Sequence, residues 1–119
     1  MQNSPKDLRK KILGRRGEDL AAKYLKARGY TILERNYKTP FGEADLVAFK
    51  DGVYCFVEVK TRTQDAFGAP SEAVDSRKRE RYRKIAASYC LMLGEEVNVR
   101  YDVAAIMSGE VDYLEGAFV

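Results

Sequence analysis

The sequence predicts an α/β fold, a sandwich in which helices flank a mixed sheet of about five strands. Two stretches have helical periodicity, and the segments between and after them are rich in β-branched and aromatic residues. The order along the chain is one helix, three strands, a second helix and two strands. The length of 119 residues suits one compact domain, and 45% hydrophobic residues are typical of a globular chain.

The first helix is predicted within residues 8–30, which end in the helix-stopping residue Gly29. Gly14 and Gly17 interrupt the pattern and leave the start of the helix open. We expect residues 1–13 to be a basic segment that is either flexible or an extension of this helix, and residues 14–119 to form a single domain. The apolar stripe of the helix consists of Leu20, Ala21, Tyr24 and Leu25.

Three strands are predicted next, over residues 30–37, 43–50 and 53–60, with a turn at 38–42. The dipeptide at 51–52 is Asp-Gly, a strong signal for a tight hairpin between the second and third strands. In the third strand one face is wholly apolar, while the other begins aromatic and ends with charged residues.

The second helix is predicted between Ser71 and Leu93, with Gly94 ending it. The loop before it, residues 63–70, is a surface loop or a mobile flap. Strands follow over 97–107 and in the last residues of the chain. The inner face of the helix is expected to carry Ile85, Ala86, Tyr89, Cys90 and Leu93.

The amino-acid composition excludes several classes of catalytic and metal site. The chain contains no histidine, which excludes Ser-His and Cys-His triads and zinc sites built on histidine. Its two cysteines, Cys55 and Cys90, are expected to be buried thiols rather than a disulfide or metal site. No apolar run is long enough to cross a bilayer and the N-terminus lacks a signal-peptide core, so we expect a cytoplasmic protein.

Basic residues gather in two segments although the net charge is only +3. Residues 77–84 hold six basic residues against one glutamate. This clustering indicates contact with a polyanion, but a solvated helix face explains it equally well. The second basic cluster consists of Lys6, Arg9, Lys10, Lys11, Arg15 and Arg16.

A two-residue Asp-Gly turn would bring charged side chains together at the far end of the hairpin. In that register Asp45 lies opposite Glu58, and Glu43 lies opposite Lys60. Two facing carboxylates repel each other, so a positive charge must compensate. Either Lys60 forms an internal ion pair, or a divalent cation such as Mg²⁺ binds the carboxylate oxygens and leaves Lys60 free for a substrate.

Two further acidic residues have less certain roles. Glu18 lies on the same helical stripe as Ala21, Ala22 and Leu25, which predicts that it faces the sheet. A helix-dipole role near a helix start is the alternative for Glu18. We expect Asp102 to be structural and to pair with a nearby arginine.

The ordered set Glu18, Asp45 and EVK (58–60) resembles the signature of the PD-(D/E)XK restriction-endonuclease-like nucleases, especially the archaeal Holliday junction resolvases. More closely, the chain resembles the YraN family of small bacterial proteins. One departure is Ala44, which stands where the motif nominally has proline. The matching segments are GRRGEDLAAKYLKARGY, ERNY, GEADLVA, FVEVKTR, AVDSRKRERYRKIAASY, RYDVAAI and the terminal AF.

The resemblance implies a restriction-endonuclease-like α/β/α sandwich and a role for each matching residue. Asp45 and Glu58 would be ligands of Mg²⁺ or Mn²⁺, with the backbone carbonyl of Val59 as a further ligand. Lys60 would be the catalytic lysine, and Glu18 a further acidic site residue. Lys78 falls where relatives often carry a helical lysine, and cleavage would leave 5′-phosphate and 3′-hydroxyl ends.

The function implied is a metal-dependent endonuclease that hydrolyses phosphodiester bonds in branched or junction DNA. We expect it to act as a homodimer, to use no small-molecule cofactor and to have no membrane partner. The alternative is an accessory module that binds nucleic acid and has little activity of its own. A protein-interaction domain with a stabilising charge network is the third possibility. The residues expected to bind the nucleic-acid backbone are Arg77, Lys78, Arg81 and Lys84. Arg62 is expected to bind nucleic acid as well, with Thr61 beside it at the scissile region.

Overall fold

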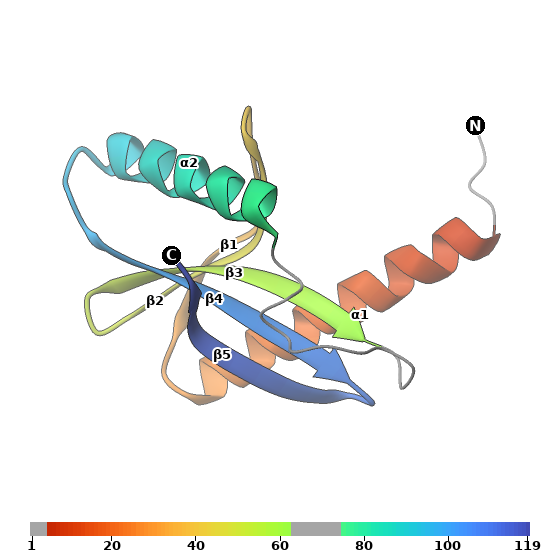
Figure 1. The fold of residues 1–119 in the computed structure, drawn as a ribbon. Helices are drawn as coiled ribbons and strands as arrows, with labels where there is room; N and C mark the ends of the chain where they lie inside the picture. The colour runs from red at the N-terminus through yellow and green to blue at the C-terminus, as the bar shows by residue number, and fades with distance from the viewer. Residues whose placement is uncertain (1–4, 63–74) are drawn as a thin grey trace.

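The computed structural model describes residues 5–62 and 75–119, with side chains from residue 14 onward (Figure 1). The predicted loop at 63–70 and the start of the predicted second helix at 71–74 lie outside the described residues. The elements are α1 (Pro5–Ala27), β1 (Thr31–Thr39), β2 (Gly42–Lys50), β3 (Val53–Arg62), α2 (Ser76–Leu93), β4 (Asn98–Met107) and β5 (Glu110–Phe118).

The strands form one mixed sheet in the order β1-β2-β3-β4-β5. All neighbours are antiparallel except β3 and β4, which are parallel because α2 connects them. α1 packs against one face of the sheet and α2 lies over the other (Figure 1). The predicted α/β fold, a five-stranded mixed sheet flanked by helices, is therefore confirmed.

Each face of the sheet has its own hydrophobic core. Both cores draw on β2, β3 and β4, the inner strands, because successive side chains of a strand point to opposite faces. The α1-side core consists of Ala21, Ala22, Leu25, Tyr30, Leu46, Ala48, Cys55, Val57, Ala104 and Ile106. The α2-side core consists of Ala44, Val47, Phe56, Tyr82, Ile85, Ala86, Tyr89, Val103 and Phe118.

The β2–β3 hairpin has the tight turn that the sequence predicts. Lys50 pairs with Val53, so the loop is two residues long. Asp51 and Gly52 both take positive φ, 50° and 78°, as a type I′ turn requires. The turn fixes the register of the hairpin from its loop as far as the pair of Leu46 and Val57.

Helix α2 is capped at both ends. The side chain of Asp75 accepts a hydrogen bond of 2.9 Å from the Lys78 amide, and Gly94 ends the helix in the left-handed conformation, as predicted. The predicted inner face was partly wrong. Cys90 is only half-buried and Leu93 is 36% exposed, so the end of α2 packs less closely against the sheet than its middle.

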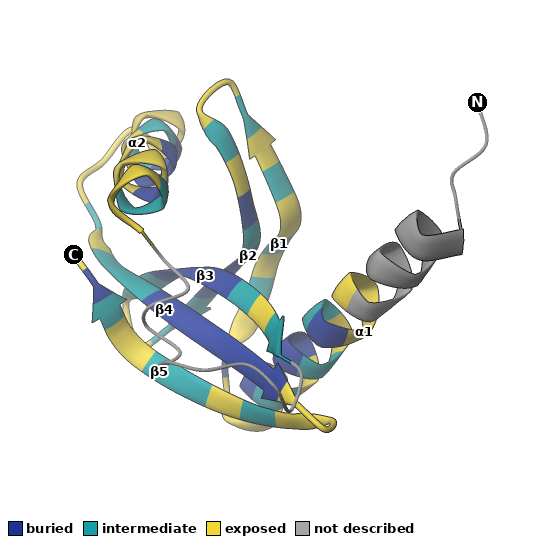
Figure 2. Ribbon diagram, turned by 45° about the vertical axis from the view of Figure 1, so that its right-hand side comes forward, coloured by how far each residue is buried: buried dark blue, intermediate teal, exposed yellow. Residues whose placement is uncertain are grey.

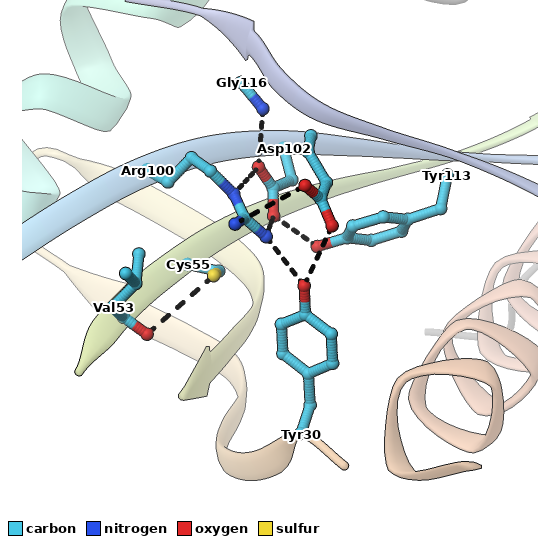
Figure 3. A network of polar contacts seen from close by, with 8 residues as sticks. Tyr30, Val53, Cys55, Arg100, Asp102, Tyr113 and Gly116 are labelled. Carbon is cyan, nitrogen blue, oxygen red and sulfur yellow. Dashed lines mark hydrogen bonds and ion pairs between the residues drawn. The ribbon is translucent and has the colours of Figure 1, made fainter. Parts of the chain in front are cut away.

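A buried polar network fastens β5 to β4 (Figure 3). Asp102, fully buried, accepts hydrogen bonds from Arg100 Nε (2.8 Å) and Nη2 (2.9 Å). It also accepts bonds from the Tyr113 hydroxyl (2.5 Å) and from the Gly116 amide (2.9 Å). Arg100 in turn donates to the Tyr30 hydroxyl, at 2.8 Å. The expectation that Asp102 is structural and pairs with an arginine is confirmed.

The network also perturbs its neighbours. Burial first, and then the Asp102 charge, raises the pKa of Tyr113, so the phenol stays a donor at neutral pH. The same two causes raise the pKa of the Cys55 thiol to about 12. Both cysteines are free, and Cys55 is buried as predicted. Neither helix of the described residues combines the length and the apolar character that crossing a membrane requires.

Replacing Asp102 is expected to destabilise the protein strongly. Asp102→Ala leaves the half-buried Arg100 guanidinium with only the more distant carboxylate of Glu115, at 3.7 Å. Removing one partner of a buried pair typically costs about 3–5 kcal/mol. Urea unfolding followed by circular dichroism measures the change in the free energy of unfolding. Asp112→Ala, which removes an exposed aspartate of β5, is the control and should change it by less than about 0.5 kcal/mol. Equal losses in the two variants would contradict this role of the network.

Candidate active site

The carboxylate of Glu58 lies on β3, directly after the last residue that pairs with β2. Glu58 is only 7% exposed, and α2 supplies partners for both of its oxygens. Lys78 Nζ lies 2.5 Å from Oε1, and the Tyr82 hydroxyl donates a hydrogen bond of 2.6 Å to Oε2. The buried charge is thus matched by one cation and one neutral donor, as burial of a carboxylate demands.

Asp45 lies where the regular geometry of β2 breaks. Leu46 packs in the α1-side core and Ala44 in the α2-side core, although regular alternation would put residues two apart on one face. On β1, Asn36 lies opposite Asp45 and has a φ of 51°, which is unusual for a residue other than glycine. Irregularities of this kind re-aim side chains and are common beside active sites.

The re-aimed carboxylate reaches β3. Asp45 Oδ2 accepts a hydrogen bond of 2.7 Å from the Val59 amide. The β2–β3 ladder ends at the pair of Leu46 and Val57, and beyond it the β1–β2 hairpin diverges from β3 toward α2 (Figure 2). A side chain therefore replaces backbone pairing at the point of divergence.

This geometry corrects the register that we predicted from the sequence. Asp45 does not pair with Glu58, and Glu43 does not pair with Lys60, because the ladder stops before both positions. Lys60 is not the internal partner of Glu58 either, since Lys78 fills that place. Lys60 is exposed and makes no ion pair with any described residue.

The acidic residues nevertheless act on one another electrostatically. Burial, followed by the charge of Glu58, raises the pKa of Asp45 from 3.8 to about 7. The hydrogen bond from Val59 opposes this rise, while the charges of Glu18 and Glu43 add to it. Three other carboxylates therefore act electrostatically on Asp45, and a cation bound there would be strongly favoured.

Glycine 17 brings α1 close to this end of the sheet. A Cβ at Gly17 would lie 2.5 Å from Thr61 Oγ1, so the helix can approach β3 this closely only without a side chain there. Glu18 follows directly and is half-buried, in agreement with the expected inward orientation. It lines an open groove of about 570 Å³ between α1 and the β1–β2 hairpin, together with Gly14, Arg15, Asn36, Lys38 and Glu43.

The predicted basic residues of α2 divide into two groups. Arg77, Arg81 and Lys84 are exposed, whereas Lys78 is half-buried against Glu58. The aliphatic part of Arg81 lies over Gly42, where a Cβ would meet Arg81 Cδ at 2.5 Å. Arg81 therefore sits between α2 and the end of the β1–β2 hairpin. Arg62, at the end of β3, is half-buried.

The oxygen donors near Asp45 suit a divalent cation that is only partly coordinated by protein. Among the described side chains, those of residues 14–62 and 75–119, no three acidic or cysteine groups lie close enough to form a complete metal site. Mg²⁺, however, typically uses only one or two carboxylates and completes its shell with waters and substrate oxygens. Asp45 and Glu58 could provide those two carboxylates, with the carbonyl of Val59, the residue between Glu58 and Lys60, as a further oxygen donor. The residues present fit such a cation if Lys78 withdraws from Glu58.

Sequence reasoning missed two residues of this region. Tyr82 was not assigned any role, although it lies three residues before Ile85 and hence on the buried stripe of α2. A tyrosine on a buried stripe needs a partner for its hydroxyl, and that requirement is the signal which could have found it. Asp75 was missed as the N-cap of α2, where an aspartate three residues before a backbone donor is typical.

Comparisons with known proteins identify a family. Residues 17–106 match the model of the uncharacterised protein family UPF0102. A UPF0102 protein of Thermodesulfovibrio yellowstonii is 46% identical over 107 residues, which cover 89% of this chain and 95% of that protein. A UPF0102 protein of Chlorobaculum parvum is 42% identical over 118 residues, 90% of this chain and 92% of its own length. One of Dictyoglomus thermophilum is 43% identical over 115 residues, with 91% and 98% covered.

The raised pKa of Asp45 predicts how stability depends on pH. Between pH 4 and pH 7 the folded protein keeps a proton on Asp45 that the unfolded chain has released, so stability falls as the pH rises through this interval. Asp45→Asn removes the dependence. In EDTA, the variant should gain roughly 1–3 kcal/mol of unfolding free energy relative to the wild type between pH 5 and pH 8.

Urea unfolding at the two pH values measures this gain. Asp112→Asn, a change at an exposed carboxylate of β5, should run parallel to the wild type. A constant difference between Asp45→Asn and the wild type at both pH values would rule out the raised pKa.

Proposed function

We propose that this chain, which belongs to the UPF0102 (YraN) family, is a metal-dependent endonuclease that hydrolyses phosphodiester bonds in DNA, with a preference for branched or junction DNA. The observation that carries the proposal is the hydrogen bond from the Val59 amide to Asp45. It holds one carboxylate within the electrostatic reach of a second, Glu58, at a strand end that also bears the exposed Lys60.

The chain's own residues have complementary roles in this proposal. Asp45, Glu58 and the Val59 carbonyl would hold Mg²⁺ or Mn²⁺. A cation bound there supplies Lewis acidity toward a phosphodiester. Lys60, which is exposed, would stabilise negative charge that builds on the phosphate in the transition state. Glu18 adds negative charge from α1, and we assign it to the orientation of water in the groove that it lines.

DNA would approach from the α2 side. The exposed cations Arg77, Arg81 and Lys84 contact the phosphate backbone, which gives affinity without sequence information. Arg62 lies at the end of β3 next to the proposed site and contacts the same backbone. Cutting a junction symmetrically takes two incisions, which a homodimer would provide.

One observation favours a second candidate function. Both oxygens of Glu58 already have partners, Lys78 and Tyr82, so the site as it stands has no free second carboxylate. A nucleic-acid-binding accessory module with little cleavage of its own needs the exposed cations but not a cation site. The two functions differ in their dependence on divalent metal and on Lys60.

Removing the ammonium group of Lys60 tests the nuclease proposal. Lys60→Ala should lower the rate of metal-dependent cleavage of an end-labelled four-way junction by about 10²–10³-fold, the usual effect of removing one group that stabilises the transition state. Because Lys60 is exposed, the melting temperature of the Lys60→Ala protein should stay close to that of the wild type. The control is Lys26→Ala, which removes an exposed lysine from the last turn of α1 and should cleave at the wild-type rate. Full activity of a folded Lys60→Ala protein would refute the assigned role.

Reversing the exposed charges of α2 tests the DNA-binding surface. The triple variant Arg77→Glu, Arg81→Glu, Lys84→Glu should bind junction DNA more weakly. The slope of log affinity against log salt should become shallower by roughly 0.9 for every phosphate that the variant no longer neutralises. Fluorescence anisotropy at several salt concentrations measures both.

The matched control reverses three exposed charges on the other helix: Lys23 and Lys26 in the C-terminal half of α1, and Arg28 directly after its end. It changes the net charge equally but leaves α2 intact, so it separates local contact from overall charge. The same decrease of affinity and slope in both triple variants would show that α2 is not the binding surface.

A further inference from the structure

The hydroxyl of Tyr82 is held in place within the candidate site by hydrogen bonds and by the packing of its ring. Tyr82 is 1% exposed, and its hydroxyl donates to Glu58 Oε2 at 2.6 Å while lying 3.3 Å from the Val57 carbonyl oxygen. Its ring packs edge-on against Phe118, with centroids 5.6 Å apart. Burial and ring packing leave the hydroxyl little freedom, so the oxygen that it contacts is held in place.

The two oxygens of Glu58 are therefore held differently. Oε2 is bound by the rigid, neutral Tyr82 hydroxyl, whereas Oε1 is bound by the flexible and half-buried ammonium group of Lys78. A lysine side chain has four rotatable bonds and can move into solvent, but a buried tyrosine ring cannot without disturbing the core. Oε1 is the oxygen that can exchange Lys78 for another cation.

Backbone pairing does not provide the same support. Beyond Val57, β3 pairs only with β4, because β2 has already diverged. Glu58 thus stands at the first position of β3 that has a neighbour on one side only. A side chain at such an edge needs support from another element if its direction is to be fixed, and on this face of the sheet that element is α2.

We propose that Tyr82 is a positioning residue, which fixes the Glu58 carboxylate through Oε2 so that Oε1 can bind a divalent cation in place of Lys78. This inference rests on the proposed function and extends it to a residue outside the motif. Tyr82 acts only through Glu58 and touches neither the cation nor the DNA.

A double-mutant cycle in EDTA tests the contact without metal or activity. Tyr82→Phe removes the hydroxyl and keeps the ring, and it is made in the wild type and in Glu58→Ala. We expect the substitution to lower the urea midpoint in the wild type and to lower it clearly less in Glu58→Ala. The same drop in both backgrounds would overturn the proposal, because the hydroxyl would then not act through Glu58.

Mn²⁺ binding, measured by calorimetry at pH 8 without DNA, tests positioning. We expect Tyr82→Phe to bind Mn²⁺ about 10–100-fold more weakly than the wild type, as removal of a partner of a metal ligand usually does. Tyr89→Phe is the matched control, because Tyr89 is a buried tyrosine of the same helix whose hydroxyl bonds to no described residue. It should bind Mn²⁺ as the wild type does.

Wild-type affinity in a folded Tyr82→Phe protein would also overturn the positioning role, even if the cycle shows coupling. A wild-type protein that binds no Mn²⁺ would contradict the metal-dependent nuclease instead. In that case the double-mutant cycle alone decides whether Tyr82 positions Glu58. The two failures are therefore distinguishable.

Discussion

The hydrogen bond between the Val59 amide and Asp45, 2.7 Å long, determines the geometry of the candidate site. It forms where the β2–β3 ladder ends, so a carboxylate takes over from backbone pairing at the point where the hairpin diverges. Without it, the Val59 amide would need another partner in a largely buried strand, and Asp45 would have no reason to lie beside Glu58. The divergence of the hairpin and the gathering of acidic charge therefore occur at the same place.

The two helices complete the site from opposite faces of the sheet. Gly17 lets α1 approach β3 closely and brings Glu18 to the groove, while α2 contributes Lys78 and Tyr82 to Glu58. The charges are only partly balanced. Lys78 compensates Glu58, but the pKa of Asp45 is raised to about 7 because burial and neighbouring carboxylates disfavour its ionised form. A site in which neighbouring carboxylates disfavour each other's ionised form is suited to a cation, which would relieve the repulsion.

Local signals in the sequence were sufficient for the elements of the fold. The Asp-Gly turn, the glycine that ends α2 and the alternation along β3 each depend on neighbouring residues, and the structure has all three. The partner of Asp102 was also predictable in kind, since a buried aspartate in a strand needs a cation or several donors. The order of helices and strands along the chain then leaves only a few possible strand orders for the sheet.

The predicted register failed at the site because it assumed regular pairing along the whole hairpin. The break at Asp45 coincides with the positive φ of Asn36 in the neighbouring strand, and no pattern within 43–60 reveals it. The partners of Glu58 come from a helix some 20 residues later, so they depend on tertiary packing rather than on period. The motif names two carboxylates, Asp45 and Glu58, whose charges interact in the structure, and their role as metal ligands stays a prediction.

The most direct test of the central claim is to locate a divalent cation in a crystal of the protein soaked in Mn²⁺, using anomalous diffraction. We expect an anomalous peak in contact with Asp45 and Glu58, with the Lys78 ammonium group moved away from Glu58. A peak elsewhere, or none while Lys78 remains paired with Glu58, would contradict the claim that these two carboxylates form a metal site.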